Sequence, residues 1–274
     1  MSTMGVHHVT EGRFRHRGAE LVYDDAGHGP LAVYAHGGFA SQANEDRMGL
    51  FVWTPVLDAG RRLVRYDARA HGRSTGEPVA TDYTYASLAD DLLALLGHLG
   101  AAEPVDGIGA SMGCGTLLHA AVRAPDRFSR LILLIPPTAW ATREAYARAN
   151  RSAADTVERE GVEAWQAAKN SRPRPAVVAD VPELPPTPEE RVLPSVLRGL
   201  ALADLPEPAA IAGLRHPALI LAWADDPGHP RATADILAGC LPDAQLRVAR
   251  TRAEVGTWGE RIAEFLTGPS RPGR

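Results

Sequence analysis

The chain has 274 residues, enough for one large domain or for a core domain with an insertion. Hydrophobic residues make up 45% and charged residues 23%, as in soluble globular proteins, and the formal charge of -4 argues against a nucleic-acid partner, because phosphate binding needs a concentrated basic face. The two cysteines, Cys114 and Cys240, provide no disulfide framework and suit a reducing compartment.

The sequence also argues against a membrane partner. The longest apolar run in the body of the chain, residues 131–135, is far too short to span a bilayer. Residues 1–10 are polar and lack the apolar run of a signal peptide. We therefore expect a cytoplasmic protein.

Short apolar runs alternate with helical stretches along the chain, which is typical of an α/β protein with a mostly parallel sheet. The first two runs predict an antiparallel hairpin that turns at Gly18 and Ala19. The later runs are rich in leucine and β-branched residues with little alternation, as expected of strands covered on both faces. The predicted strands are residues 13–17, 20–24, 31–35, 62–66, 105–108, 131–135, 218–223 and 245–249.

Helices are predicted between these strands. Residues 85–99 place five leucines at helical spacing, which forms an apolar stripe, and Gly100 follows as a stop signal. Two further helices are predicted at residues 232–240 and 259–266. The leucines of the stripe are Leu88, Leu92, Leu95, Leu96 and Leu99.

Residues 136–213 interrupt the alternation of strands and helices. They contain no convincing strand, and they predict helices at 142–169 and 189–203 with a proline-rich stretch at 172–188 between them. We interpret the whole segment as a helical cap over the sheet, with the proline-rich stretch as an alternative flexible loop. The predicted domains are a core of residues 1–135 and 214–274 and a cap insertion of residues 136–213.

One short motif points to chemistry. Residues 109–113 read GASMG, a G-x-S-x-G pentapeptide with Ser111 at its centre. The preceding residues 104–108 predict a short buried strand, and residues 114–122 predict a helix. A serine on such a strand-to-helix turn can reach a substrate, and the glycines permit the strained turn and the close packing of the helix.

Three further segments follow predicted strands, and with the pentapeptide they resemble the α/β-hydrolase superfamily over nearly the whole chain. They read HGGF at residues 36–39, DARAHGRS at 67–74 and DDPGHP at 225–230. The second is similar to the D-x-R-G-H-G-x-S turn of capped hydrolases, with Ala70 in place of the usual glycine. The resemblance implies a mostly parallel central sheet flanked by helices, with an inserted helical cap.

The resemblance also implies roles for individual residues. Ser111 is expected to be the nucleophile, and the backbone N–H groups of Gly38 and Met112 are expected to form the oxyanion hole. Asp226 lies at the position of the family's acid, and Asp225 is the alternative. His36 and His71 are expected to brace loops rather than to transfer protons.

The general base is the unusual feature. The family's histidine follows the last strand, but residues 248–253 hold two arginines and no histidine, and no histidine follows His229. Arginine cannot act as a base, because its pKa stays above about 12. Three interpretations remain: His229 has taken over as the base, the serine is not activated and the fold binds a ligand, or the site performs non-hydrolytic chemistry.

The sequence therefore predicts a serine hydrolase that acts on an ester, thioester or related acyl bond of a small hydrophobic molecule. Its catalytic residues are Ser111, Asp226 and His229. The scattered histidines, acids and cysteines have no metal-ligand spacing, so we expect no metal and no cofactor. The alternative is a non-hydrolytic protein of the same fold, either a ligand-binding pseudoenzyme or a biosynthetic cyclase or lyase. A homo-oligomer is compatible with the sequence.

Overall fold

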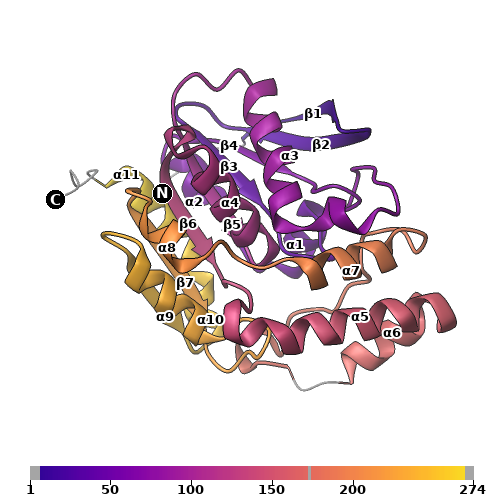
Figure 1. Ribbon diagram of the computed structural model, residues 1–274. Coiled ribbons are helices and arrows are strands. Elements are labelled where there is room, and N and C mark those ends of the chain that lie inside the picture. The colour runs from indigo at the N-terminus through magenta and orange to yellow at the C-terminus, as the bar shows by residue number, and fades with distance from the viewer. Residues whose placement is uncertain (1–6, 172–173, 269–274) are drawn as a thin grey trace.

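The computed structural model describes residues 7–171 and 174–268. In this part of the chain, eight strands form one sheet in the order β1-β2-β4-β3-β5-β6-β7-β8 (Figure 1). The pairs from β4 to β8 are parallel, while β1 and β2 pair antiparallel with each other and β2 pairs antiparallel with β4. The strands are β1 (Val9–His16), β2 (Ala19–Ala26), β3 (Leu31–Ala35), β4 (Arg62–Tyr66), β5 (Val105–Ala110), β6 (Phe128–Leu134), β7 (Ala218–Trp223) and β8 (Gln245–Ala249).

The predicted α/β fold class is confirmed, and four predicted strands match residue for residue, namely β3, β4, β7 and β8. The N-terminal hairpin is longer than predicted. β1 begins at Val9, and the turn falls at Arg17 and Gly18. β1 is an edge strand with mostly exposed, polar side chains, so its first residues have no apolar pattern that would reveal them.

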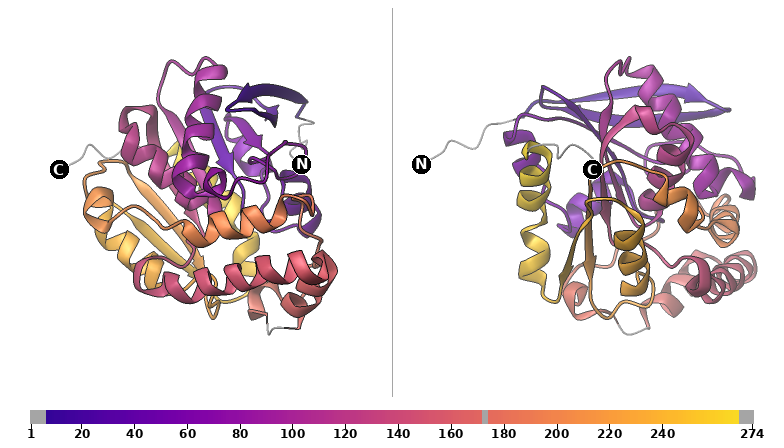
Figure 2. Two further views of the ribbon diagram at one scale, coloured as in Figure 1. Left: turned by 45° about the vertical axis from the view of Figure 1, so that its right-hand side comes forward. Right: turned by 60° about the vertical axis from the view of Figure 1, so that its left-hand side comes forward.

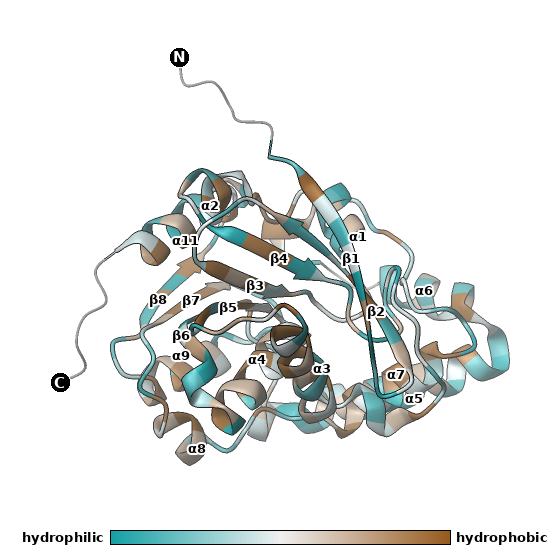
Figure 3. Cartoon of the chain, turned by 90° about the horizontal axis from the view of Figure 1, so that it is seen from above, coloured by the Kyte–Doolittle hydropathy of each residue, from teal (hydrophilic) through white to brown (hydrophobic). Residues whose placement is uncertain are grey.

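Helices cover both faces of the sheet, as the two views of Figure 2 show. On one face, α2 (Thr54–Asp58) packs beside α11 (Trp258–Thr267). On the other face lie α3 (Tyr85–His98), α4 (Met112–Arg123) and α9 (Arg231–Cys240). Strand β3, in the middle of the sheet, is largely brown, that is, hydrophobic, in Figure 3. The sheet is thus buried between two helical layers, with a hydrophobic cluster on each side.

The described part of the segment between β6 and β7 consists of helices joined by loops, and no strand occurs there. The predicted helix at 142–169 is two helices, because the chain breaks at Gly161, whose φ of 88° is easily adopted only by glycine. The helices between β6 and β7 are η3 (Trp140–Thr142), α5 (Arg143–Glu160), α6 (Val162–Asn170), η4 (Ala176–Val178), α7 (Leu193–Leu202) and α8 (Pro208–Ala212). α5 and α7 lie side by side below the sheet in Figure 1.

A buried arginine ties this helical segment together. Arg143 is 5% exposed, and its guanidinium donates to the backbone carbonyls of Thr138, Leu200 and Ala203. The same group lies over the ring of Tyr85, 5.1 Å from its centre. Since Tyr85 belongs to α3, the contact also holds α5 against the layer of helices that covers the sheet.

The division of the chain into a core domain and a cap domain stays a prediction.

The remaining short helices are α1 (Gln42–Met48), η1 (Ala80–Tyr83), η2 (Pro125–Arg127) and α10 (Arg252–Gly256). α1 follows the loop that leaves β3, and α10 follows β8. Among the helices of residues 7–171 and 174–268, none combines the length and the apolar character needed to cross a membrane.

Candidate active site

Ser111 lies on a sharp turn between β5 and α4. Its backbone has φ 49° and ψ -108°, a strained conformation for a residue other than glycine. The flanking glycines allow this turn, because a Cβ atom on Gly109 would collide with the carbonyl of Gly113, and one on Gly113 would collide with the carbonyl of Ala35. The predicted strand–serine–helix arrangement of residues 104–122 is therefore present.

The loop after β7 brings an acid and a histidine together through a local turn. The N–H of His229 donates to the carbonyl of Asp226 at 3.1 Å, which closes a four-residue turn with Pro227 and Gly228 at its centre. Asp225 precedes the turn with a φ of 60°. The side chains of Asp226 and His229 lie on the same side of this turn and contact each other.

Ser111, His229 and Asp226 form a hydrogen-bonded chain. The Oγ of Ser111 is 2.8 Å from Nε2 of His229, and Nδ1 of His229 is 2.7 Å from Oδ2 of Asp226. An ionised carboxylate can only accept a hydrogen bond, so Nδ1 carries the proton. Nε2 is then an acceptor, and the serine hydroxyl donates to it. The imidazole is thus held in the orientation and tautomer that a general base for Ser111 requires.

Asp226 is kept ionised by its surroundings. Burial alone would raise the pKa of its carboxyl group, but hydrogen bonds from His229, Trp223 and the N–H of Gly228 outweigh this effect and lower the pKa to about 2. The indole Nε1 of Trp223 donates to Oδ2 at 2.8 Å, and Gly228 donates to Oδ1 at 2.8 Å. Asp225 is exposed, and its side chain makes no hydrogen bond within the described residues.

The loop after β8 has a structural role. Thr251 caps α10, and the Glu254 carboxylate accepts from the backbone N–H groups of Arg250 and Thr251, so the two residues form a reciprocal capping box. No histidine is present in this loop. The imidazole near Ser111 therefore comes from the loop after β7.

The two expected oxyanion donors lie next to each other and next to the serine. A Cβ atom on Gly38 would be 3.8 Å from Cβ of Met112, and one on Gly37 would be 3.7 Å from Cβ of Ser111. Met112 is the first residue of α4, so its N–H has no acceptor within the helix. These positions suit backbone donors to a negative charge that develops at a carbonyl bound to Ser111.

Buried histidines brace the loop of Gly37 and Gly38. Nε2 of His36 accepts from the N–H of Ala68 at 2.9 Å, which joins the loops after β3 and β4. Burial lowers the pKa of His36, and it lowers the pKa of the neighbouring His71 to about 3. Both rings are therefore neutral at physiological pH and are packed for structure.

Glu45 of α1 is a buried acid that the sequence interpretation missed. It is 3% exposed, accepts from the N–H of Gly37 at 3.2 Å and accepts from the hydroxyl of Tyr34 at 2.7 Å. Burial raises its pKa to about 7, against the opposing effect of these two hydrogen bonds. Glu45 thus positions the loop that holds Gly38.

We expect Glu45→Gln to remove a pH dependence of stability. The folded-state pKa of Glu45 is about 7, above the ordinary 4.5, so this group favours the fold at low pH and disfavours it as pH rises from about 4.5 to 7. Glutamine keeps the shape without the buried charge. The variant should be more stable than the wild type at pH 8, by roughly 3 kcal/mol, with no such gain at pH 4.5.

Denaturant unfolding at the two pH values checks this expectation. Glu103→Gln is the matched control, because Glu103 is exposed and its side chain forms no hydrogen bond or ion pair among the described residues. Equal pH dependence in the wild type and in Glu45→Gln would contradict the role of burial given above.

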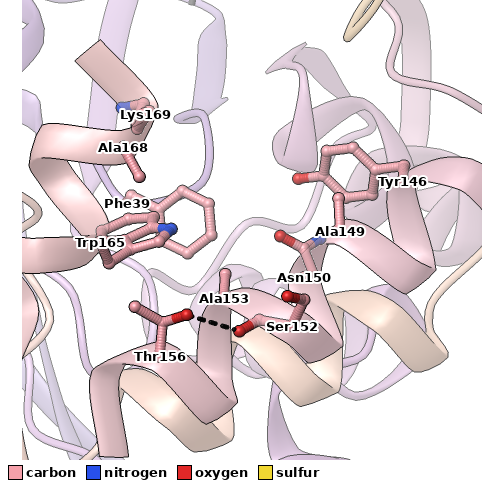
Figure 4. Close-up of a pocket in the computed structure, with 10 residues that line it drawn as sticks. All are labelled: Phe39, Tyr146, Ala149, Asn150, Ser152, Ala153, Thr156, Trp165, Ala168 and Lys169. Atoms are coloured by element: carbon pink, nitrogen blue, oxygen red, sulfur yellow. Dashed lines mark hydrogen bonds between the residues drawn. The ribbon is translucent and has the colours of Figure 1, made fainter. Parts of the chain in front are cut away.

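One cavity borders the site, and a second shares Phe39 and Lys169 with it. The first, of about 450 Å³, is lined by Gly38, Asp226 and Gly228 among others. The second, of about 330 Å³, lies between α5 and α6, where Tyr146 faces Trp165 (Figure 4). Trp140 of η3 donates its indole N–H to the carbonyl of Pro206.

Cys114, three residues after Ser111, is not suited to nucleophilic chemistry. It is buried, its thiol donates to the carbonyl of Gly109 at 3.0 Å, and burial raises its pKa well above the usual range. Within the described ranges, no group of three or more histidine, cysteine, aspartate or glutamate side chains could hold a metal ion.

Known proteins resemble this chain at several levels. The profile of a family described as alpha/beta hydrolase fold matches residues 30–251. The sn-1-specific diacylglycerol lipase ABHD11 of Mus musculus is 35% identical over 105 residues, which cover 38% of this chain and 32% of the lipase. The bifunctional esterase/perhydrolase DCH of Acinetobacter calcoaceticus is 32% identical over 125 residues, which cover 44% of this chain and 43% of that protein. The matches thus span less than half of either relative.

Solved structures share the whole fold. The crystal structure of the enol-lactonase from Burkholderia xenovorans LB400 superposes with a TM-score of 0.75 at 23% identity, over 94% of this chain and 100% of that chain. At this identity the likeness concerns the fold alone. The match of the family profile to residues 30–251, together with the sheet described above, shows that the chain belongs to the α/β hydrolase fold family.

Proposed function

We propose that the protein is a serine hydrolase whose catalytic residues are Ser111, His229 and Asp226. The observation that supports this most strongly is the 2.8 Å contact between Oγ of Ser111 and Nε2 of His229. A serine hydroxyl is a weak nucleophile at neutral pH and needs an adjacent base. The presence of an imidazole in hydrogen-bond reach favours hydrolysis over the alternative of a pseudoenzyme with an idle serine.

In the proposed reaction, Ser111 Oγ attacks the carbonyl carbon of an acyl substrate while its proton passes to Nε2 of His229. The carbonyl electron pair moves to oxygen, and the N–H groups of Gly38 and Met112 stabilise that oxyanion. The intermediate collapses as the bond to the leaving group breaks, and the imidazolium returns its proton to the leaving group. Water, deprotonated by His229, then attacks the acyl-serine, and the imidazolium returns this proton to Oγ of Ser111 as the bond to the acyl carbon breaks and the acid is released.

Asp226 acts through His229 in this scheme. Its carboxylate holds Nδ1–H in place and stabilises the imidazolium that forms in both half-reactions. The hydrogen bond from Trp223 and that from Gly228 fix the carboxylate in turn. The base has thus moved from the loop after β8 to the loop after β7, which is permitted because a triad is defined by geometry rather than by chain order.

We also propose that residues 136–213 act as a cap that shapes a pocket for a small hydrophobic acyl group. Tyr146 and Trp165 line the cavity between α5 and α6, and Phe39 adjoins Gly38 in the loop after β3. Two of the relatives are described as a diacylglycerol lipase and an esterase/perhydrolase. An ester or thioester of a small molecule is therefore the proposed substrate class.

Hydrolysis of small esters and thioesters tests this proposal. We expect the wild type to hydrolyse at least one 4-nitrophenyl ester or acyl thioester of short chain length, and Ser111→Ala to lose that activity. Thr116→Val is a control on the same helix, because the buried Thr116 hydroxyl donates to the backbone carbonyl of Met112 within that helix. Absence of turnover in folded wild type, or turnover that survives Ser111→Ala, would contradict the proposal.

A further inference from the structure

The wall shared by the two cavities contains an unusual residue. The chain has 29 lysine and arginine residues in total, and Lys169 is the single lysine. Lys169 lines both the cavity beside Gly38 and the cavity between α5 and α6, and Phe39 is the other residue common to both. Since Gly38 and Asp226 line the first cavity, a group that extends from these residues past Phe39 passes Lys169.

Lys169 is exposed to solvent, and no acid among the described residues pairs with it. Its ammonium lies 5.8 Å from the ring centre of Trp165. The nearby acid Glu183 is paired with Arg174 at 3.3 Å, and Asp226 is held by His229. Among the residues that the structure describes, no acidic side chain lines the cavity between α5 and α6.

Asn150 adds a second polar group to this cavity. Asn150 is 7% exposed, and its Nδ2 has no hydrogen-bond partner within the described part of the chain. Figure 4 shows Asn150 beside Tyr146, across the cavity from Phe39 and Trp165. Buried amides are normally hydrogen-bonded, so an unpaired one on a cavity wall indicates a missing partner.

The apolar part of the cavity has flat walls. The rings of Phe39 and Trp165 meet edge to face with centres 5.4 Å apart, and the Tyr146 ring is held by the Arg143 guanidinium at 4.6 Å. Such walls suit a planar group. The volume of about 330 Å³ is in the range of small-molecule sites.

We propose that the acyl part of the substrate is a planar group that carries a carboxylate, with Lys169 pairing with the carboxylate and Asn150 hydrogen-bonding to a polar atom of the same acyl part. This inference rests on the proposed hydrolase function and names its substrate class. Lys169 and Asn150 are specificity-determining residues in this account.

Three matched esters test the proposal: the 4-nitrophenyl esters of benzoate, 4-carbamoylbenzoate and 4-carboxybenzoate. The last two have nearly the same shape and differ in charge. We expect wild-type kcat/KM to favour the carboxylate over the carboxamide by about two- to fivefold, the range for an ion pair with an exposed side chain. Lys169→Met should bring this ratio close to one, and Lys169→Arg should preserve most of it. Asn150→Leu should reduce the advantage of both polar esters over the benzoate ester.

A binding measurement separates this inference from the hydrolase proposal. Because Lys169 is the single lysine, reductive methylation modifies only its ammonium and the α-amino group, which peptide mass distinguishes. Terephthalate should slow methylation of Lys169 in the wild type and in Ser111→Ala alike, and benzamide should not. If terephthalate protects Lys169 from methylation but no ester is hydrolysed, the anion site is supported and the proposed hydrolase function is contradicted. Hydrolysis with equal rates on all three esters and no protection would overturn the inference alone.

Discussion

Replacing His229 by alanine should lower kcat/KM for ester hydrolysis by about 10⁴- to 10⁶-fold, the range found when a triad loses its base. The imidazole is the group within hydrogen-bond distance of Ser111, at 2.8 Å, and the loop after β8 offers no replacement. Ser111→Ala should cost about as much, and the double variant should be no slower than either single variant. Steady-state kinetics on a small ester measures all three.

His216→Ala is the matched control for this experiment. His216 precedes β7 and His229 follows it, so the two histidines lie at opposite ends of one strand. Nε2 of His216 contacts the backbone carbonyl of Pro125 at 3.0 Å, far in sequence from the serine turn. This variant should keep the activity of the wild type. Turnover that is unchanged by His229→Ala would contradict the relocated base.

Asp226→Asn should lower kcat by about 10⁴-fold, because an amide in place of the carboxylate favours the wrong imidazole tautomer. Oδ2 of Asp226 accepts from Nδ1 of His229 at 2.7 Å and from the indole of Trp223 at 2.8 Å. An asparagine nitrogen in place of Oδ2 would be a donor that faces the N–H groups of His229 and Trp223, which are donors themselves. The same kinetic assay measures the loss, and unfolding by denaturant checks that the variant is folded.

Asp225→Asn distinguishes the two acids that the sequence left as alternatives. Asp225 is exposed and has a φ of 60°, a conformation that asparagine tolerates well, so the exchange should leave both stability and activity near wild type. Equal losses in Asp225→Asn and Asp226→Asn would show that the charge of the loop matters rather than one specific carboxylate.

The sequence predicted the parallel part of the fold well, for a physical reason. Strands such as β7 and β3 are buried on both faces, so each appears as a continuous apolar run between polar or glycine-containing segments. The exposed edge strand β1 has no such run, and its first residues were missed. The break in the predicted helix at 142–169 depends on Gly161, and a single glycine within a polar helical pattern is a weak signal.

The site was predictable where it depends on local sequence. The turn at Ser111 is encoded by its own glycines, and the sequence DPGH at residues 226–229 is a turn signal that places an acid and a histidine three residues apart. The contact between Ser111 and His229 joins residues 118 positions apart, so it depends on the order β5-β6-β7 in the sheet. Glu45 and Lys169 belong to no recognisable sequence motif, so the side chains that surround them could not be predicted from the sequence.

The most direct test of a serine activated by His229 is the rate of covalent labelling by a fluorophosphonate. The probe reports an activated serine without knowledge of the substrate, and intact mass counts the label on the wild type, Ser111→Ala and His229→Ala. We predict one label on the wild type, none on Ser111→Ala, and a rate on His229→Ala that is slower by about 10²-fold or more. Equal labelling rates of the wild type and His229→Ala, or no labelling of folded wild type, would contradict the account.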